Sequence, residues 1–314
     1  MDKRVIYFCL FLKKDQDLHY YSMAYWSLKT LSNFYDNSFD VILFYDSNVE
    51  NFELEKVHIN NFNMVKDFNF VKFIKLNYYE KYKQKKDPFS YKDQNFFSNI
   101  SNIWMFKWFG LEKIFSLGYE KILFLDVDTV FYRNPAEIFS SLNEKCVYVS
   151  LEQMFSSIIS SNSKYISKIS PNKPANPLLL NRNINNGNGI NGGQIFFSKV
   201  KMNNFFDLYY KSRLDLNEDA KQLFQEGKID EIFYKYLTSF NEQWAPLLVF
   251  DFYKINVTKI PPILIKRGKI IDKTPCVFHY EQIKYKHELI PEELHTPLIK
   301  EQRLKFMKEK TANK

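Results

Sequence analysis

Apolar residues recur along the chain in short runs that predict buried β-strands, separated by segments of helical character. In the first part of the chain the runs are Val5 to Leu12, Val41 to Tyr45 and Val71 to Leu76, and the segment His19 to Ser32 predicts a helix. A strand, helix, strand order with short connections is typical of right-handed parallel crossovers. The pattern therefore predicts an α/β fold in which helices flank a mostly parallel sheet.

The same alternation continues through the rest of the chain. The predicted strands there are Ile122 to Leu125, Val147 to Leu151, Gln194 to Ser198 and Val277 to Tyr280. The predicted helices are Asn99 to Leu117, a short one starting at Asn134-Pro135, most of Phe205 to Leu248, and Pro297 to Lys310. Gly118 is expected to end the first of these helices, and Pro135 to be the first residue of the second. The polar segments 13–17, 78–95 and 156–186 predict loops, and the last can close over a ligand. Without a repeat or an interdomain linker, we expect one domain over residues 1–290 and a basic helical tail over 291–314.

Composition and charge narrow the class of protein. The 314 residues can bury a large core, and 45% hydrophobic with 25% charged residues is typical of soluble globular proteins. A net charge of +8 suits an acidic partner such as a nucleotide diphosphate, an anionic glycan or a membrane surface. No basic-aromatic nucleic-acid module is present, so nucleic acid is not expected. The basic C-terminal helix is either a peripheral membrane contact or an ordinary surface helix.

The three cysteines, Cys9, Cys146 and Cys276, are scattered and odd in number. Without Cys-x-x-Cys spacing they indicate neither a disulfide framework nor a zinc site, and reduced thiols fit a cytoplasm-like compartment. The apolar run Val5 to Leu12 is too short to span a bilayer and lacks a signal-peptide cleavage site. We therefore expect a cytoplasmic protein.

Two acidic residues directly follow the apolar run Ile122 to Leu125. Alternate side chains of an extended chain point the same way, so Asp126 and Asp128 are expected to leave the sheet on one side while Val127 stays with the core. Such close negative charges repel, and a bound Mg²⁺ or Mn²⁺ removes this repulsion and can neutralise a diphosphate. The alternative is that the carboxylates cap a turn or the next helix.

A glycine-rich segment and a late histidine are further candidates. In Asn191-Gly192-Gly193 the adjacent glycines permit positive φ angles and close approach of a ligand, and the asparagine can donate to a sugar hydroxyl. The alternative is a tight turn before a strand. His279 can complete a metal site with the two aspartates, or be a hydrogen-bonded core residue.

Three groups of polar residues could contact a sugar or phosphate. Glu242 and Gln243, next to Trp244, can line a sugar pocket, although Asn241-Glu242 is also an ordinary helix start. Lys107, Lys284 and Lys286 can each hold phosphate oxygens or simply face solvent, the last two following closely on His279.

In this order, the segments resemble those of the GT-A glycosyltransferases, most closely the family 8 type that includes glycogenin and bacterial lipopolysaccharide galactosyltransferases. Tyr119 to Phe139 resembles the metal-binding segment, and Asn191-Gly192-Gly193 the Asn-Ala-Gly sugar-binding segment. Glu242-Gln243 resembles the Asp-Gln pair, and Phe278-His279-Tyr280 with nearby lysines the C-terminal metal histidine and phosphate lysine. The resemblance covers most of the chain from Val5 to Lys286.

The resemblance implies a Rossmann-like GT-A fold and transfer of a sugar, with retention of configuration, from a UDP-sugar to a glycan or protein acceptor. Mn²⁺ or Mg²⁺ is implied at Asp126, Asp128 and His279, and Gln243 or Glu242 beside the transferred sugar. The implied donor-binding residues are Asp126, Val127, Asp128, Lys107, Phe11, Leu12, Tyr20, Asn191, Gly192, Gly193, Lys284 and Lys286. The oligomeric state stays open, a homodimer included.

The chain departs from the family in three places. The N-terminal segment, to which the uridine contacts Phe11, Leu12 and Tyr20 are assigned, matches poorly. Glu242 replaces an aspartate, which lengthens the side chain and affects which sugar fits. Gln282 stands where the family has glycine, and the expected lysine is displaced to Lys284 or Lys286.

Two other classes of protein are compatible with the Asp-x-Asp motif. It also resembles that of haloacid dehalogenase-like phosphatases, in which the first aspartate is a nucleophile and the second an acid. In those enzymes a threonine stands two positions after the second aspartate, where this chain has Val130. A non-catalytic glycan-binding protein of the same fold is the other alternative, although the charged residues are all present.

Overall fold

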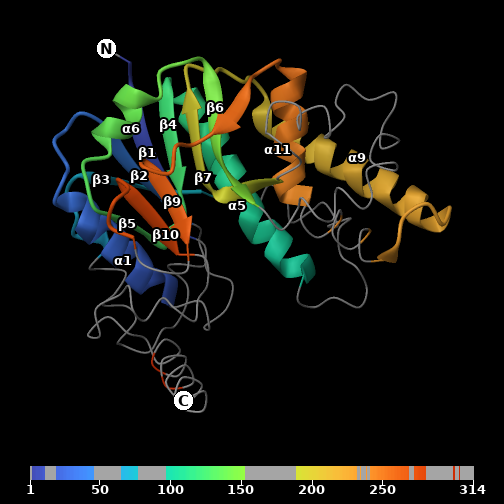
Figure 1. The fold of residues 1–314 in the computed structure, drawn as a ribbon, viewed down its shortest axis with the longest axis horizontal. Helices are drawn as coiled ribbons and strands as arrows, with labels where there is room; N and C mark the ends of the chain where they lie inside the picture. Colours follow the sequence, from blue (N-terminus) through green and yellow to red (C-terminus); the bar gives the residue numbers. More distant parts are fainter. Residues whose placement is uncertain are drawn as a thin grey trace. The chain divides into compact units, whose positions relative to one another are not determined.

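The computed structural model describes residues 2–10, 19–45, 65–76, 97–152, 189–231, 234, 238, 241–268, 272–280, 300 and 304. A seven-stranded sheet has the strand order β3-β2-β1-β4-β7-β6-β8 (Figure 1). Its strands are β1 (Arg4–Leu10), β2 (Asp40–Tyr45), β3 (Val71–Lys75), β4 (Lys121–Leu125), β6 (Cys146–Glu152), β7 (Gly189–Ser198) and β8 (Val257–Lys259). The pairs β1–β2, β2–β3 and β6–β8 are parallel and β6–β7 is antiparallel, which confirms the predicted α/β class.

A second, three-stranded sheet has the order β5-β10-β9. It consists of β5 (Thr129–Phe131), β9 (Ile265–Gly268) and β10 (Val277–Tyr280). The sequence predicted β10 with these bounds but neither β5 nor β9. β5 has only three residues, too few to show a period, and β9 has Ile265 as its one apolar side chain, whereas β10 contains Val277 and Phe278.

The helices are α1 (His19–Ser32), α5 (Phe97–Ser116), α6 (Ala136–Ser141), α9 (Phe205–Gln225) and α11 (Asn241–Phe252). The bounds of α1 are those predicted, and Gly118 follows α5 with a left-handed φ of 77°, as expected of a residue that ends a helix. The short helix α6 begins one residue after Pro135 rather than at it. The Asn134 side chain accepts a hydrogen bond from the Ala136 amide, at 2.9 Å, and so closes the turn before this helix.

The chain forms two compact units, each assembled from distant parts of the sequence. The first unit is Met1–Lys3, Tyr78–Ile122 and Asn143–Ile260, and the second is Arg4–Asn77, Leu123–Leu142 and Pro261–Lys314. The division into residues 1–290 and a tail over 291–314 stays a prediction.

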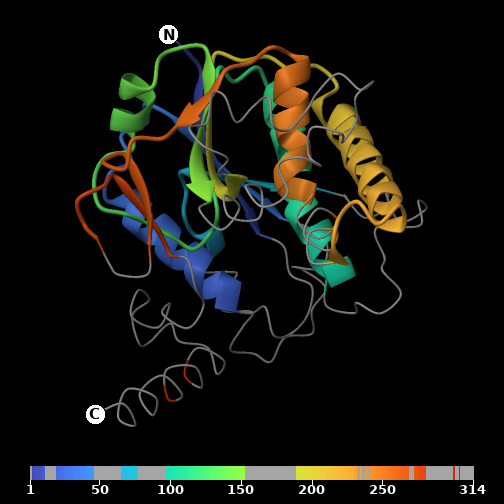
Figure 2. The same cartoon turned by 45° about the vertical axis from the view of Figure 1, so that its right-hand side comes forward.

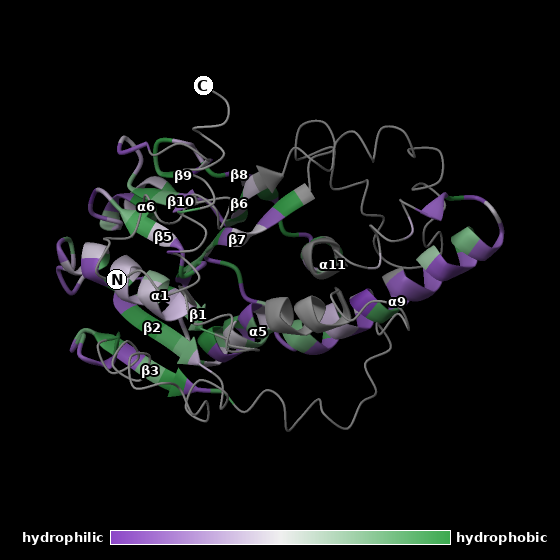
Figure 3. Ribbon diagram, turned by 90° about the horizontal axis from the view of Figure 1, so that it is seen from below, coloured by the Kyte–Doolittle hydropathy of each residue, from purple (hydrophilic) through white to green (hydrophobic). Residues whose placement is uncertain are grey.

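In the second unit, buried aromatic side chains fill the space around β1 and β2. The ring of Tyr7 lies 4.9 Å from that of Phe124 and 6.0 Å from that of Phe44, centroid to centroid. Every residue of β2 after Asp40 is buried, and Figure 3 shows this strand in hydrophobic colours. Each such side chain contributes about 1.5–3 kcal/mol on burial, so this core can support the carboxyl ends of its strands rigidly.

In the first unit, α9 packs against α11 and α5, and α11 packs on β7 (Figure 2). The Trp108 ring of α5 lies 5.8 Å from Phe205 and 5.7 Å from Tyr209 of α9. Hydrophobic and hydrophilic residues alternate along α9 in Figure 3, as expected of a helix with one buried face. Among the described residues no helix is long and apolar enough to cross a membrane.

Candidate active site

A tight turn, rather than an extended strand, brings the two aspartates together. β4 is buried at every residue and ends at Leu125; Val127 and Asp128 form a turn, and β5 begins at Thr129. The expectation that the carboxylates converge through strand alternation is therefore wrong in its geometry. The sequence also predicted that Val127 stays with the core, and this is confirmed, because the residue is only 5% exposed.

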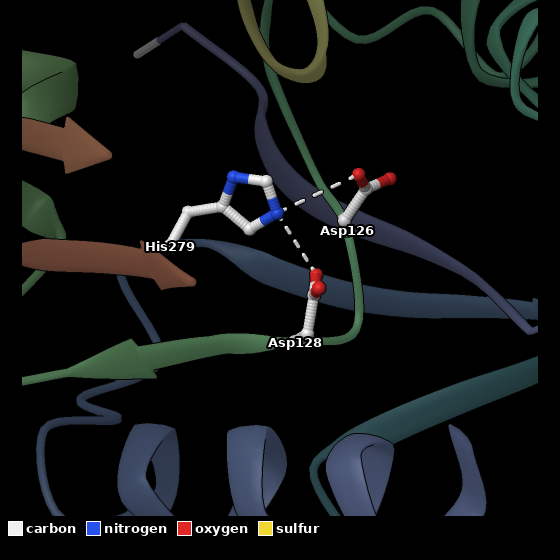
Figure 4. A group of neighbouring side chains, drawn as sticks. All are labelled: Asp126, Asp128 and His279. Atoms are coloured by element: carbon white, nitrogen blue, oxygen red, sulfur yellow. Dashed lines mark ion pairs between the residues drawn. The ribbon is translucent and has the colours of Figure 1, made fainter. Parts of the chain in front are cut away.

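Strand pairing supplies the third member of the site from far along the chain. β10 runs antiparallel to β5, and His279 lies opposite Thr129, the residue next to Asp128. The imidazole Nε2 lies 3.0 Å from Oδ1 of Asp128 and 3.8 Å from Oδ2 of Asp126 (Figure 4). All three residues belong to the second unit, so this unit alone provides the whole cluster.

The cluster lies at the edge of the protein interior. The side chains of Asp128 and His279 are 9% and 7% exposed, whereas that of Asp126 is 42% exposed. Nδ1 of His279 points away from the carboxylates in Figure 4, and it is buried without a hydrogen-bond partner among the described residues. The arrangement is thus buried on the side of Asp128 and open to solvent at Asp126.

These residues fit a divalent metal ion. One ligand atom from each lies within 4.8 Å of the others. At a metal–ligand distance of about 2.1 Å, neighbouring ligands of an octahedral ion are about 3.0 Å apart and opposite ligands about 4.2 Å, and the two measured separations lie in that range. Two carboxylates suit Mg²⁺ or Mn²⁺, and the imidazole adds a preference for a transition ion.

Tyr7 lies on β1, close to the cluster, and remains protonated there. Its side chain is buried, and burial raises the pKa of the phenol well above its usual range, with smaller contributions from the charges of Cys9 and Asp126. A neutral phenol adds no further negative charge beside the two carboxylates.

The glycine segment lies within β7 and not in a turn before it. Val149 of β6 pairs with Ile195 while the adjacent Ser150 pairs with Asn191, so residues 192–194 form an irregular bulge. The sequence did not indicate this, because the pairing of β6 with β7 is non-local. A bulge of this kind exposes backbone groups that regular pairing would use.

Lys107 and Asn191, two predicted ligand contacts, hydrogen-bond to the backbone of this bulge. The buried Lys107 ammonium donates to the Gly192 carbonyl at 2.9 Å, and the Asn191 side chain accepts from the Gly193 amide at 2.9 Å. An ammonium has three N–H groups, so a phosphate contact of Lys107 stays a prediction. The predicted roles of Asn191, Gly192 and Gly193 in donor binding also stay predictions.

The remaining predicted residues are only partly described. Glu242 and Gln243 lie in the first turn of α11, and Tyr20 is half-buried near the start of α1. Phe11, Leu12, Lys284 and Lys286 lie outside the described residues, so their predicted contacts are untested.

All three cysteines are free, as expected, and two have thiols that keep their protons. Burial raises the pKa of Cys146 to about 11 and that of Cys276 to about 12, the latter also through its hydrogen bond to Glu137. Both thiols are therefore mostly protonated at neutral pH, which lowers their reactivity as nucleophiles.

Hydroxyl groups around the cluster were not indicated by the sequence. Ser27 and Thr30 of α1 contact β5, the strand that begins directly after Asp128. Thr129, directly after the Asp-x-Asp motif, was the one signal that could have pointed to such contacts.

No model of a protein family matches the sequence, and a search of curated proteins finds no match. Among solved structures, the chain is similar to the WbbM bifunctional glycosyltransferase in its apo form (12% identity, TM-score 0.48, 96% of this chain and 51% of that one). It therefore spans about half of the WbbM chain. It is also similar to the galactosyltransferase LgtC in complex with donor and acceptor sugar analogs (10% identity, TM-score 0.45, 88% and 86%). A further similar structure is mouse xyloside xylosyltransferase 1 in its apo form (12% identity, TM-score 0.47, 89% and 97%). Likenesses of this order assign no activity, so a functional assignment depends on the residues of the chain itself.

Proposed function

We propose that the protein is a metal-dependent glycosyltransferase that moves a sugar from a nucleotide sugar, of which a UDP-sugar is our first choice, to a glycan or protein acceptor. The observation that carries the proposal is the cluster of Asp126, Asp128 and His279 at the carboxyl end of β4. In α/β sheets ligands gather at the carboxyl ends of strands. The segments that resemble the GT-A family support the same assignment.

Different residues of the chain are proposed to bind the metal and to contact the sugar in such a reaction. Asp126, Asp128 and His279 would hold Mn²⁺ or Mg²⁺, which when bound supplies positive charge to the diphosphate leaving group. Exposure of Asp126 leaves that carboxylate accessible from solvent, whereas burial of Asp128 and His279 keeps their geometry constant. Gln243 and Glu242 are proposed to lie beside the sugar, whose anomeric carbon gains positive charge as the bond to phosphate breaks.

We further propose that the configuration at the anomeric carbon is retained. The bond from this carbon to the phosphate oxygen breaks, the bond to the acceptor oxygen forms on the same face, and the departing phosphate oxygen takes the proton of the acceptor hydroxyl. No side chain is then required as a general base. Product stereochemistry, read by nuclear magnetic resonance of the newly formed linkage, tests this part separately.

The third member of the cluster argues against the phosphatase alternative. A haloacid dehalogenase-like site uses further acidic groups to hold Mg²⁺, whereas the side chain that meets Asp126 and Asp128 in the described part of the chain is the imidazole of His279. The imidazole therefore favours the transferase over the phosphatase. A non-catalytic glycan-binding protein of the same fold could hold the same cluster, and the absence of any sugar transfer by the unmodified protein would distinguish it from the transferase.

A screen of nucleotide sugars tests the proposal. The purified chain is incubated with UDP-, GDP- and CMP-linked sugars in the presence of Mn²⁺, and release of the nucleotide is measured together with thermal stabilisation. We expect one class of donor to be hydrolysed slowly and to raise the melting temperature only with the metal, and chelation to remove both effects. Release of inorganic phosphate from phosphomonoesters, without any turnover of nucleotide sugars, would establish the phosphatase instead.

A further inference from the structure

A chain of buried hydroxyl groups connects α1 to the turn that carries the aspartates. Oγ of Ser27 and Oγ1 of Thr129 are 3.2 Å apart, and Oγ1 of Thr129 donates to the backbone carbonyl of Asp126 at 3.0 Å. Ser27 and Thr129 are 0% and 1% exposed, so water does not compete for these contacts. The hydroxyl of Thr129 thus adds a side-chain hydrogen bond across the turn from Asp126 to Thr129.

Which hydroxyl is the donor in each of these hydrogen bonds follows from the number of protons that each one has. A hydroxyl has one proton to donate and two lone pairs to accept with. Thr129 uses its proton on the Asp126 carbonyl, which can only accept. Ser27 is therefore the donor to Thr129, and this donation polarises the Thr129 hydroxyl and strengthens its bond to the turn.

Thr129 also fixes the position of the histidine. It is the residue of β5 that lies opposite His279 of β10 in the antiparallel pair. The same residue thus contacts the turn that bears both carboxylates and determines where the imidazole lies across from them. A shift of Thr129 would move all three candidate ligands relative to one another.

A second hydroxyl of α1, that of Thr30, also forms a hydrogen bond with β5, about one helical turn after Ser27. Oγ1 of Thr30 donates to the Ser27 carbonyl at 2.9 Å and accepts a hydrogen bond from the Phe131 amide at 3.2 Å. Residues three apart share one face of a helix, so Ser27 and Thr30 together present a polar edge to β5. Burial of a hydroxyl costs free energy unless the group forms hydrogen bonds, and the hydroxyls of Ser27 and Thr30 both form hydrogen bonds with β5.

We propose that Ser27 is a positioning residue of the metal centre, which acts through Thr129 to hold Asp126 and Asp128 at the spacing that an ion requires. The inference rests on the proposed function, because it concerns the same cluster. Neither residue touches the ion or the substrate in this scheme. Their contribution lies in the geometry that the ligands have before the ion binds.

The test measures binding of Mn²⁺ to the purified chain without any nucleotide, by electron paramagnetic resonance of the unbound ion. Loss of an outer partner of a metal ligand commonly weakens binding about 10–100-fold. We expect Thr129→Val to raise the Kd about tenfold and Ser27→Ala to raise it about threefold, since the latter leaves the Thr129 contact in place but unsupported. Thr129→Ser, which keeps the hydroxyl, should restore binding to within about twofold.

Ser22→Ala is the matched control for a general loss of a buried hydroxyl. Ser22 is on the same helix and 1% exposed, and its hydroxyl has no hydrogen-bond partner among the described residues. We expect this variant to bind Mn²⁺ like the unmodified protein. The double variant Ser27→Ala with Thr129→Val should bind Mn²⁺ no more weakly than Thr129→Val alone, because both changes interrupt the same series of hydrogen bonds from Ser27 through Thr129 to Asp126.

The possible results separate this inference from the proposed function. If the unmodified chain binds no Mn²⁺, Mg²⁺ or Zn²⁺, the metal centre itself is wrong and both proposals fail. If it binds the ion and Ser27→Ala binds equally well, only the positioning role fails. Equal weakening by Ser22→Ala would also overturn it, since packing of α1 would then be the cause. Should Thr129→Val not fold, Ser27→Ala decides alone, because alanine is favourable in a helix.

Discussion

The candidate metal cluster of Asp126, Asp128 and His279 and the bulge of β7 both involve polar residues that the sequence predicts to be functional, but these side chains act in different ways. In the cluster, the acceptor atoms of Asp126, Asp128 and His279 face one another within 4.8 Å. In the bulge, Lys107 and Asn191 each hydrogen-bond to the backbone of β7. The first arrangement concentrates charge at one point, whereas the second gives an irregular strand a definite shape.

The comparison teaches that a polar residue in a candidate site can act through its charge or through the backbone it supports. Close carboxylates cost free energy through repulsion, which a bound cation removes. A buried ammonium bonded to a carbonyl instead stabilises the fold directly. Variants in the two regions should therefore affect different measurements.

The largest effect is expected in the cluster. Asp128→Ala should abolish Mn²⁺ binding and lower sugar transfer by about 10³-fold, as expected when a centre that stabilises developing charge is lost. Circular dichroism and the melting temperature should stay close to those of the unmodified protein. Asp126→Ala is expected to behave in the same way, and transfer that survives either change would contradict the assignment of these carboxylates.

In the bulge, stability should change before metal binding does. Lys107→Met keeps most of the side-chain volume but leaves the buried Gly192 carbonyl without this donor, at a cost of about 1–3 kcal/mol in the free energy of unfolding. Urea unfolding measures the loss, and the Kd for Mn²⁺ should not change. If stability were unaltered while binding of the nucleotide weakened, Lys107 would act as a phosphate contact instead.

A smaller effect is expected at Asn191. Asn191→Ala removes the acceptor of the Gly193 amide and should lower the free energy of unfolding by about 1 kcal/mol. Hydrogen exchange at the Gly193 amide should become faster in the same variant. Asn191→Asp retains an acceptor oxygen and should protect this amide about as well as asparagine does.

The smallest effect on stability is expected at Asp36 of the second unit, an exposed carboxylate that accepts hydrogen bonds from neighbouring groups. Asp36 accepts from the Ser38 amide at 2.9 Å and from the Asn134 side chain at 3.0 Å. The pKa of Asp36 is lowered by hydrogen bonds, first that of the Ser38 side chain, then that of the Asn134 side chain and then that of the Ser38 amide. A carboxyl whose pKa is lowered by folding stabilises the protein above its unfolded pKa, about 3.9, and loses this contribution as the pH falls through the folded value.

Asp36→Ala should therefore be less stable than the unmodified protein at neutral pH, by about 0.5 kcal/mol or less because the group is exposed. The difference between the two proteins should disappear in acid, below the folded pKa of Asp36. Thermal unfolding across a series of pH values measures it. A difference that grows as the pH falls would show that the hydrogen bonds do not act as described.

The sequence by itself determined the nature and order of most elements. The continuous apolar runs of β1 and β2 follow from burial on both faces of the sheet, a local property that the residues themselves carry. The position of Asp126 at the end of a fully buried strand could be predicted in the same way. Free cysteines also followed from spacing alone.

Only the tertiary structure decided how the site is assembled. His279 meets the aspartates because β10 pairs with β5, and the choice of a partner strand depends on side chains that lie far apart in the sequence. The turn after β4, the bulge of β7 and the hydroxyl contacts of Ser27 arise in the same manner. A local pattern states what a segment buries, but its register against a distant segment is set by packing, which no single segment encodes.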